Sequence, residues 1–282
     1  MSSPAPGRPR LATDNFDLEQ ELLLEAVYQK YQHDFRHYAR ASLRRRIGQA
    51  LERYQCRTVS QLQHRVLHEP EVFAGMLQYV TVQVSEMFRD PSYFAAIREK
   101  VVPLLRSHPF AKLWVAGCST GEEAWSLAIL LEEEGLLDRS LIYATDINPV
   151  ALATAEAGVY ALDRVALFSA NYHQAGGRRS LVDYYQAAYG GAVFDKALKA
   201  QIVFSDHSLA TDSVFSEMEF VSCRNVLIYF DRELQARAID LFHDSLGPRG
   251  FLGIGSKETL RYSKHSGAFE EFASDERIYR KR

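Results

Sequence analysis

The sequence predicts an α/β protein in which a mostly parallel sheet carries a small antiparallel insert and follows an α-helical N-terminal region. Residues 13 to about 80 are rich in Leu, Glu, Gln and Arg and contain glycine only at Gly48 and Gly75, which is typical of helices. From about residue 110, short apolar runs alternate with helical ones, as in a parallel sheet with crossover helices.

Composition bounds the class of protein. The 282 residues are 47% hydrophobic, enough for one large core or two modest ones, and the net charge of −3 argues against a surface that binds nucleic acid throughout. Cys56, Cys118 and Cys223 are widely spaced and form no Cys-x-x-Cys pair, so neither a disulfide framework nor a zinc site is indicated. Residues 1–12 are expected to be a disordered lead. No apolar run approaches the roughly 18 residues needed to span a bilayer, and we therefore expect a cytoplasmic protein without membrane insertion.

The N-terminal region carries one apolar stripe with an arginine cluster beside it. Apolar residues recur at three- and four-residue steps at Phe35, Ala39, Leu43, Ile47, Ala50 and Tyr54. We therefore expect Arg44, Arg45 and Arg46 to flank or oppose this buried stripe.

The predicted sheet begins with strands at 112–116 and 141–145. The helix predicted between them ends near Gly135. Its buried apolar face is made of Ala124, Leu127, Ala128 and Leu131. Asn148 before Pro149 is a good helix start and Gly158 a good stop, which predicts a short helix between them.

The alternation breaks between 160 and 200. A Gly190-Gly191 turn there suits a β-hairpin insert at about 180–200. The pattern then resumes with predicted strands at 201–205, 219–223 and 225–230, a helix from Asp231 to Gly247-Pro248, and apolar runs at 250–256 and 276–281.

One glycine-rich turn stands between a strand and a helix, in "WVAGCSTGEEAWSLAI" at 114–129, and is typical of a nucleotide site. Glu122 and Glu123 follow Gly121, where a triphosphate loop would have Lys and Ser or Thr, and their charge would repel a polyphosphate. A cationic nucleotide such as S-adenosylmethionine fits better, with Asp146 accepting hydrogen bonds from its ribose. Each acid alone is equally consistent with an ordinary helix-start or turn residue; together they favour the methyl donor.

Five motifs occur in order: "VSEMFRDPSYF", "AGCSTGEEAWSLAI", "ATDIN", "CRNVLIYFD" and "GIGSKETL". With them the chain, from about residue 13 to its end, resembles the CheR family of chemotaxis protein-glutamate O-methyltransferases. The resemblance implies a Rossmann-like S-adenosylmethionine-dependent methyltransferase domain over 91–282, with a small inserted antiparallel β-subdomain. It also implies a preceding α-helical domain over 13–90 that docks the substrate.

The same resemblance implies the site residues. Arg224 and Tyr229 would be catalytic, with Tyr229 beside the transferring methyl group and Ser208 and Leu209 against the adenine. The donor would be bound by Gln83, Ser85, Arg89, Gly117, Ser119, Glu123, Asp146, Ser208, Leu209, Arg224 and Asn225. Taken alone, Ser208 and Leu209 are equally well explained as a strand end, Tyr229 as a core aromatic, and Arg224 as half of a structural ion pair.

The implied reaction is methyl transfer from S-adenosylmethionine to receptor glutamate carboxylates, giving a methyl ester and S-adenosylhomocysteine. An exposed glutamate with a pKa near about 4.3 is ionised at neutral pH, so neither a strong base nor a metal is required. Two alternatives remain at this point: a carboxyl methyltransferase acting on another protein or a small molecule, and a non-catalytic module that senses the donor or its product.

The implied partner is a chemoreceptor cytoplasmic domain. Arg44, Arg45 and Arg46 would face its acidic methylation helices; a solvated face and a nucleic-acid patch are the other interpretations of this cluster. Some family members capture a receptor C-terminal pentapeptide with the β-insert. The turn around "AAYGGAVF" is short, which favours an enzyme independent of the pentapeptide.

Overall fold

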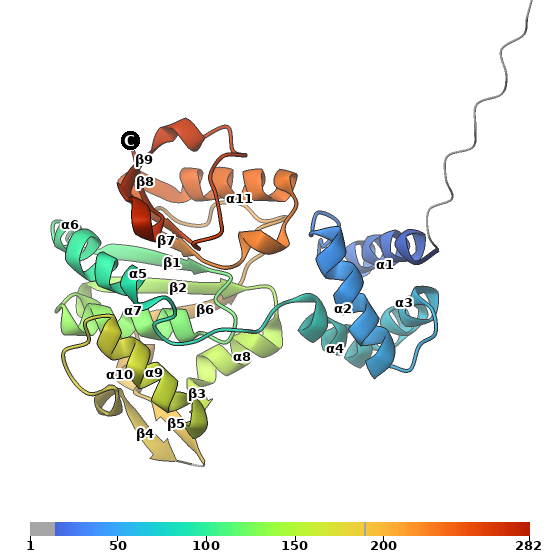
Figure 1. Cartoon of the computed structure of the whole chain (residues 1–282), viewed down its shortest axis with the longest axis horizontal. Coiled ribbons are helices and arrows are strands. Elements are labelled where there is room, and N and C mark those ends of the chain that lie inside the picture. Colours follow the sequence, from blue (N-terminus) through green and yellow to red (C-terminus); the bar gives the residue numbers. More distant parts are fainter. Residues whose placement is uncertain (1–14, 189) are drawn as a thin grey trace, which may run out of the picture. The chain divides into compact units, whose positions relative to one another are not determined.

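The computed structural model describes residues 15–188 and 190–282, and the expected lead at 1–12 lies outside them. The described chain forms two compact units (Figure 1). Unit 1 holds the described residues up to Arg36 together with Arg40–Val80, and unit 2 holds His37–Ala39 and Thr81–Arg282. The division thus falls ten residues before the expected domain boundary at 90. None of the helices among the described residues is long and apolar enough to cross a bilayer.

Unit 1 is all helical within the described residues. Its helices are α1 (Asn15–Tyr31), α2 (Arg40–Arg53), α3 (Val59–His68) and α4 (Pro70–Val80). Apolar side chains from each helix are buried, among them Leu23, Val27, Leu43, Ile47, Leu62, Val66, Met76 and Leu77. The Thr58 hydroxyl caps α3 by accepting a hydrogen bond from the Gln61 amide at 3.2 Å.

The apolar stripe of unit 1 differs from the prediction in two ways. Helix α2 begins only at Arg40, so Phe35 and Ala39 precede it. Arg46 is buried, because it shares a helix face with Leu43 and Ile47, and its Nη1 donates a 2.6 Å hydrogen bond to the Val80 carbonyl. The expectation that all three arginines flank or oppose the stripe is therefore wrong for Arg46.

Unit 2 is built on a seven-stranded sheet of order β6-β2-β1-β7-β8-β10-β9. The neighbours from β6 to β8 are parallel, and β10 and β9 add an antiparallel edge. The strands are β1 (Ala111–Ala116), β2 (Ser140–Asp146), β6 (Ile202–Asp206), β7 (Met218–Cys223), β8 (Leu246–Ile254), β9 (Phe269–Ala273) and β10 (Ile278–Lys281).

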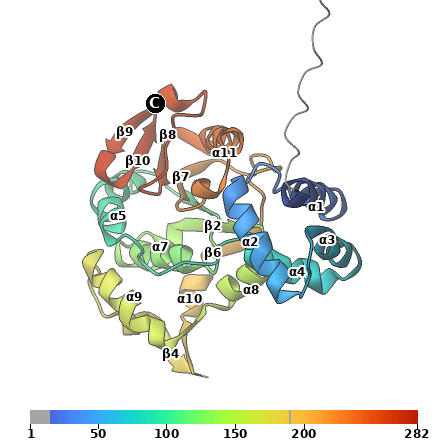
Figure 2. The same cartoon turned by 45° about the vertical axis from the view of Figure 1, so that its right-hand side comes forward.

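Helices cover both faces of this sheet (Figure 2). Strand β1 alternates as a central strand should: Leu113 and Val115 join the core beneath α7, whereas Trp114 and Ala116 join the core beneath α11. The helices are α5 (Pro91–Ala96), a π-helical turn η1 (Ile97–Val101), α6 (Val102–Leu105), α7 (Glu122–Glu133), α8 (Pro149–Ala157), α9 (Leu162–Gln174), α10 (Lys196–Lys199) and α11 (Arg232–Ser245).

A separate small sheet carries the predicted insert. Strands β4 (Tyr185–Ala188) and β5 (Gly191–Phe194) form the antiparallel hairpin, and β3 (Val159–Ala161) pairs with the other side of β5. The hairpin is confirmed; its third strand lies before the predicted insert. Tyr189, in the turn, lies outside the described residues.

The short helix at 149–157 is confirmed, with the Asn148 side chain accepting from the Val150 amide at 3.0 Å and Gly158 at φ +61°. One prediction is wrong: residues 225–230 form no strand but a 3₁₀ turn, η4 (Leu227–Tyr229). The predicted helix capped by Asp231 is confirmed as α11, which ends at Ser245, just before Gly247-Pro248. These two residues belong to β8, whose pairing with β7 begins at Leu246.

Candidate functional site

The candidate site lies at the carboxyl ends of β1, β2, β6 and β7, where an open parallel sheet binds its ligands. The segments that follow these strands are 117–121, 147–148, 207–209 and 224–229. The segment 83–89 joins them through a 2.7 Å hydrogen bond from Ser119 Oγ to Gln83 Oε1. Most residues proposed from sequence are therefore brought to one edge of the sheet.

The loop after β1 needs its glycines. Gly117 has φ +75°, and a Cβ there would lie 2.5 Å from Val226 Cγ2. Gly121 has φ +92°, and a Cβ there would lie 2.7 Å from Ala155 Cβ. The amides of Gly117 and Cys118 both donate to the Thr145 carbonyl at 2.8 Å. The loop is thereby held close against the end of β2.

Asp146 fixes this loop from the end of β2. Its Oδ2 accepts a 2.8 Å hydrogen bond from the Ser119 amide, and its Oδ1 accepts one at 3.0 Å from the Asn148 amide. Burial raises the pKa of Asp146, and these amide donors partly offset that rise. Asp146 therefore shapes the loop as well as offering a carboxylate at the sheet edge.

The two glutamates of the loop have different surroundings. Glu122 is buried, with Oε1 2.9 Å from Arg164 Nη1 and Oε2 accepting from Thr120 Oγ1 at 2.7 Å. Glu123 is half-buried, and its Oε1 accepts a 2.6 Å hydrogen bond from Ser222 Oγ. Burial raises the pKa of Glu123, while the positive charge of Arg224 and the Ser222 bond act in the opposite direction.

Arg224 is buried behind Glu123. Its Nη2 lies 2.7 Å from Asp90 Oδ2, its Nη1 donates to the Arg89 carbonyl at 3.1 Å, and its guanidinium lies 3.8 Å from the centre of the Tyr93 ring. Within the described residues, Arg224 Nε has no hydrogen-bond partner although it is buried. A buried donor without a partner calls for one that the described residues do not supply, such as a water molecule or a ligand.

The segment after Arg224 is held by Glu258, a residue that sequence reasoning missed. Asn225 has φ +61°, and Glu258 is buried with Oε1 accepting from the Ile228 amide at 3.3 Å and Oε2 from the Gly255 amide at 2.5 Å. Its position in "GIGSKETL" was the available signal. Tyr229, half-buried in η4, packs against the core beneath α11.

Three other residues proposed to bind the methyl donor are held mainly by contacts within the protein or are buried in its core. The Ser208 amide donates to Asp212 Oδ2 at 2.9 Å, and the Leu209 side chain is buried in the core that contains Trp114. Ser85 supplies its carbonyl to Arg164 Nη2, and its hydroxyl has no partner among the residues that are described.

The arginine cluster of unit 1 does not form one exposed patch. Arg44 pairs with Asp17 and lies 4.4 Å from the centre of the Phe16 ring. Arg45 is exposed and makes no hydrogen bond or ion pair within the described chain. Arg46 is buried, as described above, so the accessible cations of the cluster are Arg44 and Arg45.

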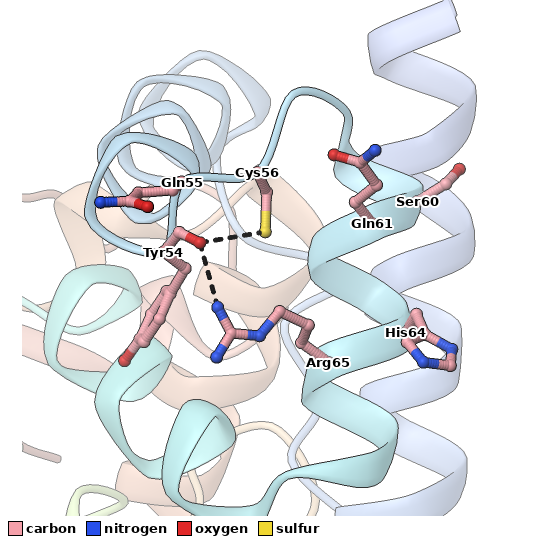
Figure 3. Close-up of a pocket in the computed structure, with 7 residues that line it drawn as sticks. All are labelled: Tyr54, Gln55, Cys56, Ser60, Gln61, His64 and Arg65. Atoms are coloured by element: carbon pink, nitrogen blue, oxygen red, sulfur yellow. Dashed lines mark hydrogen bonds between the residues drawn. The ribbon is translucent and has the colours of Figure 1, made fainter.

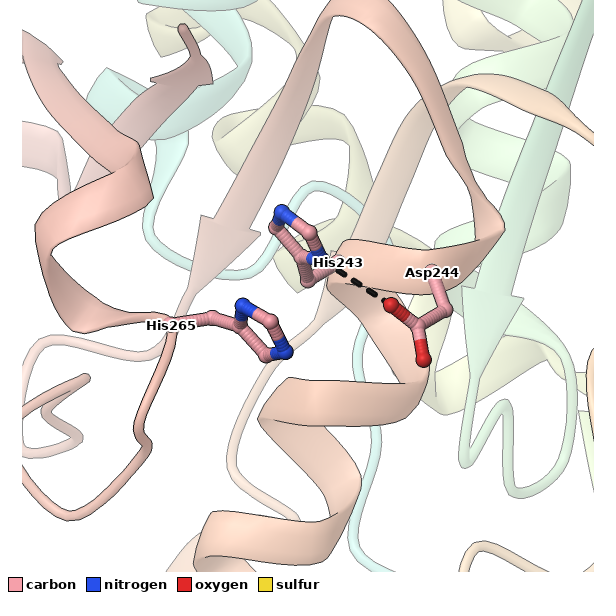
Figure 4. Close-up of side chains that lie close together, drawn as sticks. All are labelled: His243, Asp244 and His265. Carbon is pink, nitrogen blue, oxygen red and sulfur yellow. Dashed lines mark hydrogen bonds and ion pairs between the residues drawn. The ribbon is translucent and has the colours of Figure 1, made fainter.

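Two further features involve residues that the sequence did not single out as site residues. Unit 1 has a depression of about 560 Å³ where Arg65 Nη1 donates to the Tyr54 carbonyl at 3.0 Å (Figure 3). In unit 2, His243 Nδ1 lies 3.0 Å from Asp244 Oδ1, and the His243 and His265 rings stack 3.9 Å apart and 5° from parallel (Figure 4). A metal ion lies in the plane of each imidazole that binds it, so these two rings, as they lie, cannot share one ion.

Comparisons with known proteins follow the division into units. Residues 18–81 match the family model of the CheR methyltransferase all-alpha domain, and residues 83–278 match that of the CheR methyltransferase SAM binding domain. A Pseudomonas putida protein named "Putative methyltransferase Cher3" is 57% identical over 267 residues, which cover 95% of this chain and 98% of that protein. A Listeria monocytogenes chemotaxis protein methyltransferase is 30% identical over 249 residues, covering 86% and 92%.

A solved structure is similar at a greater distance. The SAM-dependent methyltransferase of Geobacter sulfurreducens in complex with S-adenosyl-L-homocysteine has a TM-score of 0.34 and 12% identity, covering 64% of this chain and 54% of its own. This likeness is too distant to bear on the site. The family models and the relatives suffice: the chain belongs to the CheR family of S-adenosylmethionine-dependent methyltransferases, with an α/β methyltransferase domain, a small antiparallel sheet and an all-α N-terminal domain.

Proposed function

We propose that this protein methylates glutamate side chains of a chemoreceptor in the cytoplasm, giving glutamate methyl ester and S-adenosylhomocysteine. Membership of the family supports the class of reaction. The main support for a methyl-donor site is the environment of Glu123. Its Oε1 accepts a hydrogen bond from Ser222, whereas its Oε2 has no partner within the described residues. A carboxylate fixed on one side and open on the other suits a cationic ligand.

The residues at the sheet edge fit the methyl donor chemically. Glu123 would hold the ammonium of its methionine part, Arg89 the carboxylate at the same end, and Asp146 the ribose hydroxyls. The unpaired Arg224 Nε adds a buried donor on this side of the sheet. The remaining assigned contacts are Gln83, Ser85, Gly117, Ser119, Ser208, Leu209 and Asn225.

When bound, the donor supplies a methyl group on a sulfonium sulfur, and the chain must align a carboxylate with it. No base is needed because the acceptor glutamate is already ionised at neutral pH. Both terminal nitrogens of Arg224 are engaged by the 89–90 segment, so this guanidinium is held rigidly. Arg224 would orient the acceptor, and Tyr229 would line the path of the methyl group; alignment of two reactants is worth about 7–11 kcal/mol.

The decisive experiment uses labelled S-adenosylmethionine and candidate receptor cytoplasmic domains. We expect a methyl label that alkali releases, and its loss when the acceptor glutamates are changed to alanine. Donor binding without any label on any receptor would contradict this function and favour a sensing module. Label on small carboxylic acids in place of receptors would favour a small-molecule methyltransferase.

The roles of Arg224 and Tyr229 are tested in variants that still bind the donor. Arg224→Ala and Tyr229→Phe should lower turnover, whereas Tyr262→Phe, which removes a hydroxyl from an exposed tyrosine in unit 2, should not. Unchanged turnover in either of the first two variants would remove that residue from the mechanism.

We further propose that Arg44 and Arg45 of α2 dock the acidic methylation helices of the receptor. The remainder of the cluster, Arg46, would support α2 from within unit 1. We also propose that docking needs no receptor pentapeptide. Methylation of a receptor domain truncated before its C-terminal tail tests this, and loss of the label on truncation would contradict it.

A further inference from the structure

A chain of buried hydroxyl groups leads to Glu123. Tyr93 Oη, on α5, lies 2.7 Å from Ser222 Oγ, near the end of β7, and Ser222 Oγ donates at 2.6 Å to Glu123 Oε1 on α7. Ser222 has a single hydroxyl hydrogen and uses it on Glu123, so the Tyr93 hydroxyl must donate to Ser222. Two hydroxyl groups from two separate elements are thus ordered in one direction.

Close packing holds the Tyr93 and Ser222 hydroxyl groups in place. Tyr93 and Ser222 are both fully buried. A Cβ at Gly253, on β8, would collide with Tyr93 Oη, so this glycine makes space for the hydroxyl. The Arg224 guanidinium lies over the Tyr93 ring, 3.8 Å from its centre. The tyrosine is therefore fixed by packing, and it fixes Ser222.

We propose that Tyr93 and Ser222 are positioning residues that hold the Glu123 carboxylate with one oxygen aimed at the methyl donor. This rests on the proposed function, in which Glu123 holds the donor's ammonium group. Neither hydroxyl is a catalytic residue, because neither is assigned a contact with the donor or the acceptor. Their effect on the donor passes through Glu123 Oε1, the oxygen that Ser222 occupies.

The ionisation of Glu123 gives this arrangement a measurable signature. Burial raises the pKa of Glu123, and the Ser222 hydrogen bond lowers it, as do the charges of Arg224 and Arg89. Asp90 acts in the opposite direction, and the buried thiols of Cys118 and Cys223 also lie near Glu123. Without the Ser222 hydroxyl, the carboxylate loses a stabilising donor, so its pKa rises further. The pH below which donor binding is lost should rise with it.

The test is calorimetric binding of S-adenosylmethionine as a function of pH to the full chain and four variants, one of which is Glu123→Gln. Ser222→Ala should weaken binding about 10-fold at neutral pH and move the acid limit of binding to higher pH, since hydrogen bonds to charged groups are the strong ones. Tyr93→Phe keeps the ring beneath Arg224 and should act in the same direction by about 2–5-fold. Tyr172→Phe is the matched control, because its hydroxyl donates to Glu133 Oε1 at 2.5 Å and is hydrogen-bonded to neither Ser222 nor Glu123.

The outcomes separate this proposal from the one it rests on. Normal binding by Glu123→Gln would mean that the donor site itself is misassigned. Weak binding by Glu123→Gln, with wild-type affinity and acid limit in Ser222→Ala and Tyr93→Phe, would overturn the positioning role alone. If the substitutions merely loosened unit 2, Tyr172→Phe would weaken binding as well, and no variant would change the acid limit of binding. That result would also overturn the positioning role. If Ser222→Ala fails to fold, Tyr93→Phe decides.

Discussion

Glu122 and Glu123 are consecutive, yet the Glu122 carboxylate lies 2.9 Å from Arg164 Nη1 whereas the Glu123 carboxylate accepts from Ser222. Successive side chains on an α-helix are about 100° apart, so one position faces α9 and the next faces β7. Arg164 also donates to the Ser85 carbonyl, so this arginine joins α9 both to Glu122 on α7 and to the 83–89 segment. The pair thus divides into an acid that makes a structural ion pair and the acid that we propose holds the methyl donor.

We expect Glu123→Gln to be at least as stable as the wild type at neutral pH when no donor is present. Burial raises the pKa of Glu123, so the folded protein binds that proton more tightly than the unfolded chain does. The stability linked to this group is therefore present at low pH and lost as pH rises through the raised pKa. The difference in free energy of unfolding between the two proteins should shrink from about pH 7 to about pH 5. Urea titrations measure it, and a difference independent of pH would contradict it.

Glu122→Gln should behave in the opposite way and destabilise unit 2 by about 1–3 kcal/mol, because it leaves the Arg164 guanidinium without its carboxylate. A double-mutant cycle with Arg164→Gln isolates the pair, and we expect a favourable coupling energy. Glu156→Gln, at an exposed position on α8, is the matched charge control. Additive effects of the two changes would show that the ion pair contributes nothing.

Arg45→Glu should lower receptor methylation several-fold while leaving the melting temperature and donor affinity unchanged, because this exposed side chain has no partner within the described residues. Arg57→Glu makes the same charge change at another exposed position of unit 1. If both reversals lower methylation equally, net charge rather than a docking surface on α2 is responsible.

Arg46→Met should instead lower the stability of unit 1 by about 1–3 kcal/mol, because the buried Val80 carbonyl loses its donor. Thermal unfolding followed by circular dichroism measures the change. Arg45→Met, one residue earlier and exposed, should alter the free energy of unfolding by no more than about 0.5 kcal/mol. Equal losses in the two variants would contradict the buried role of Arg46.

Local sequence signals were sufficient for the elements that they alone determine. Asn148 and Gly158 mark the two ends of α8. Each signal depends on one residue alone: the side-chain oxygen of Asn148 caps the helix, and Gly158 readily adopts the left-handed conformation that ends it. The continuous apolar run of β1 likewise indicates a strand that is buried on both faces of a sheet. Two acids could also be placed at the sheet edge from sequence. Asp146 directly follows the second predicted strand, and Glu123 lies at the start of the helix that follows the glycine-rich turn.

Contacts between distant segments could not be predicted in this way. The apolar run at 225–230 matches a strand, but Asn225 has φ +61° and the Glu258 carboxylate accepts from the Ile228 amide, which turns the chain into η4. Three adjacent arginines give no sign of which one is buried, since that depends on where α2 begins. Nothing in the local sequence distinguishes Ser222 and Tyr93 from other strand and helix residues. Their link to Glu123 depends on contacts between distant segments.

The π-helical turn η1 has a consequence for the helix on either side of it. Residues 91–105 run continuously through α5, η1 and α6, and the wide turn accommodates Arg98, which lies 2.7 Å from Glu133 and 2.9 Å from Glu134. A π-helical turn takes up its extra residue within a single wider turn, so α5 and α6 keep nearly the rotational phase of one continuous helix. Deleting one residue at η1 would therefore narrow this turn and disturb the ion pairs of Arg98, while the Tyr93 hydroxyl would still face β7.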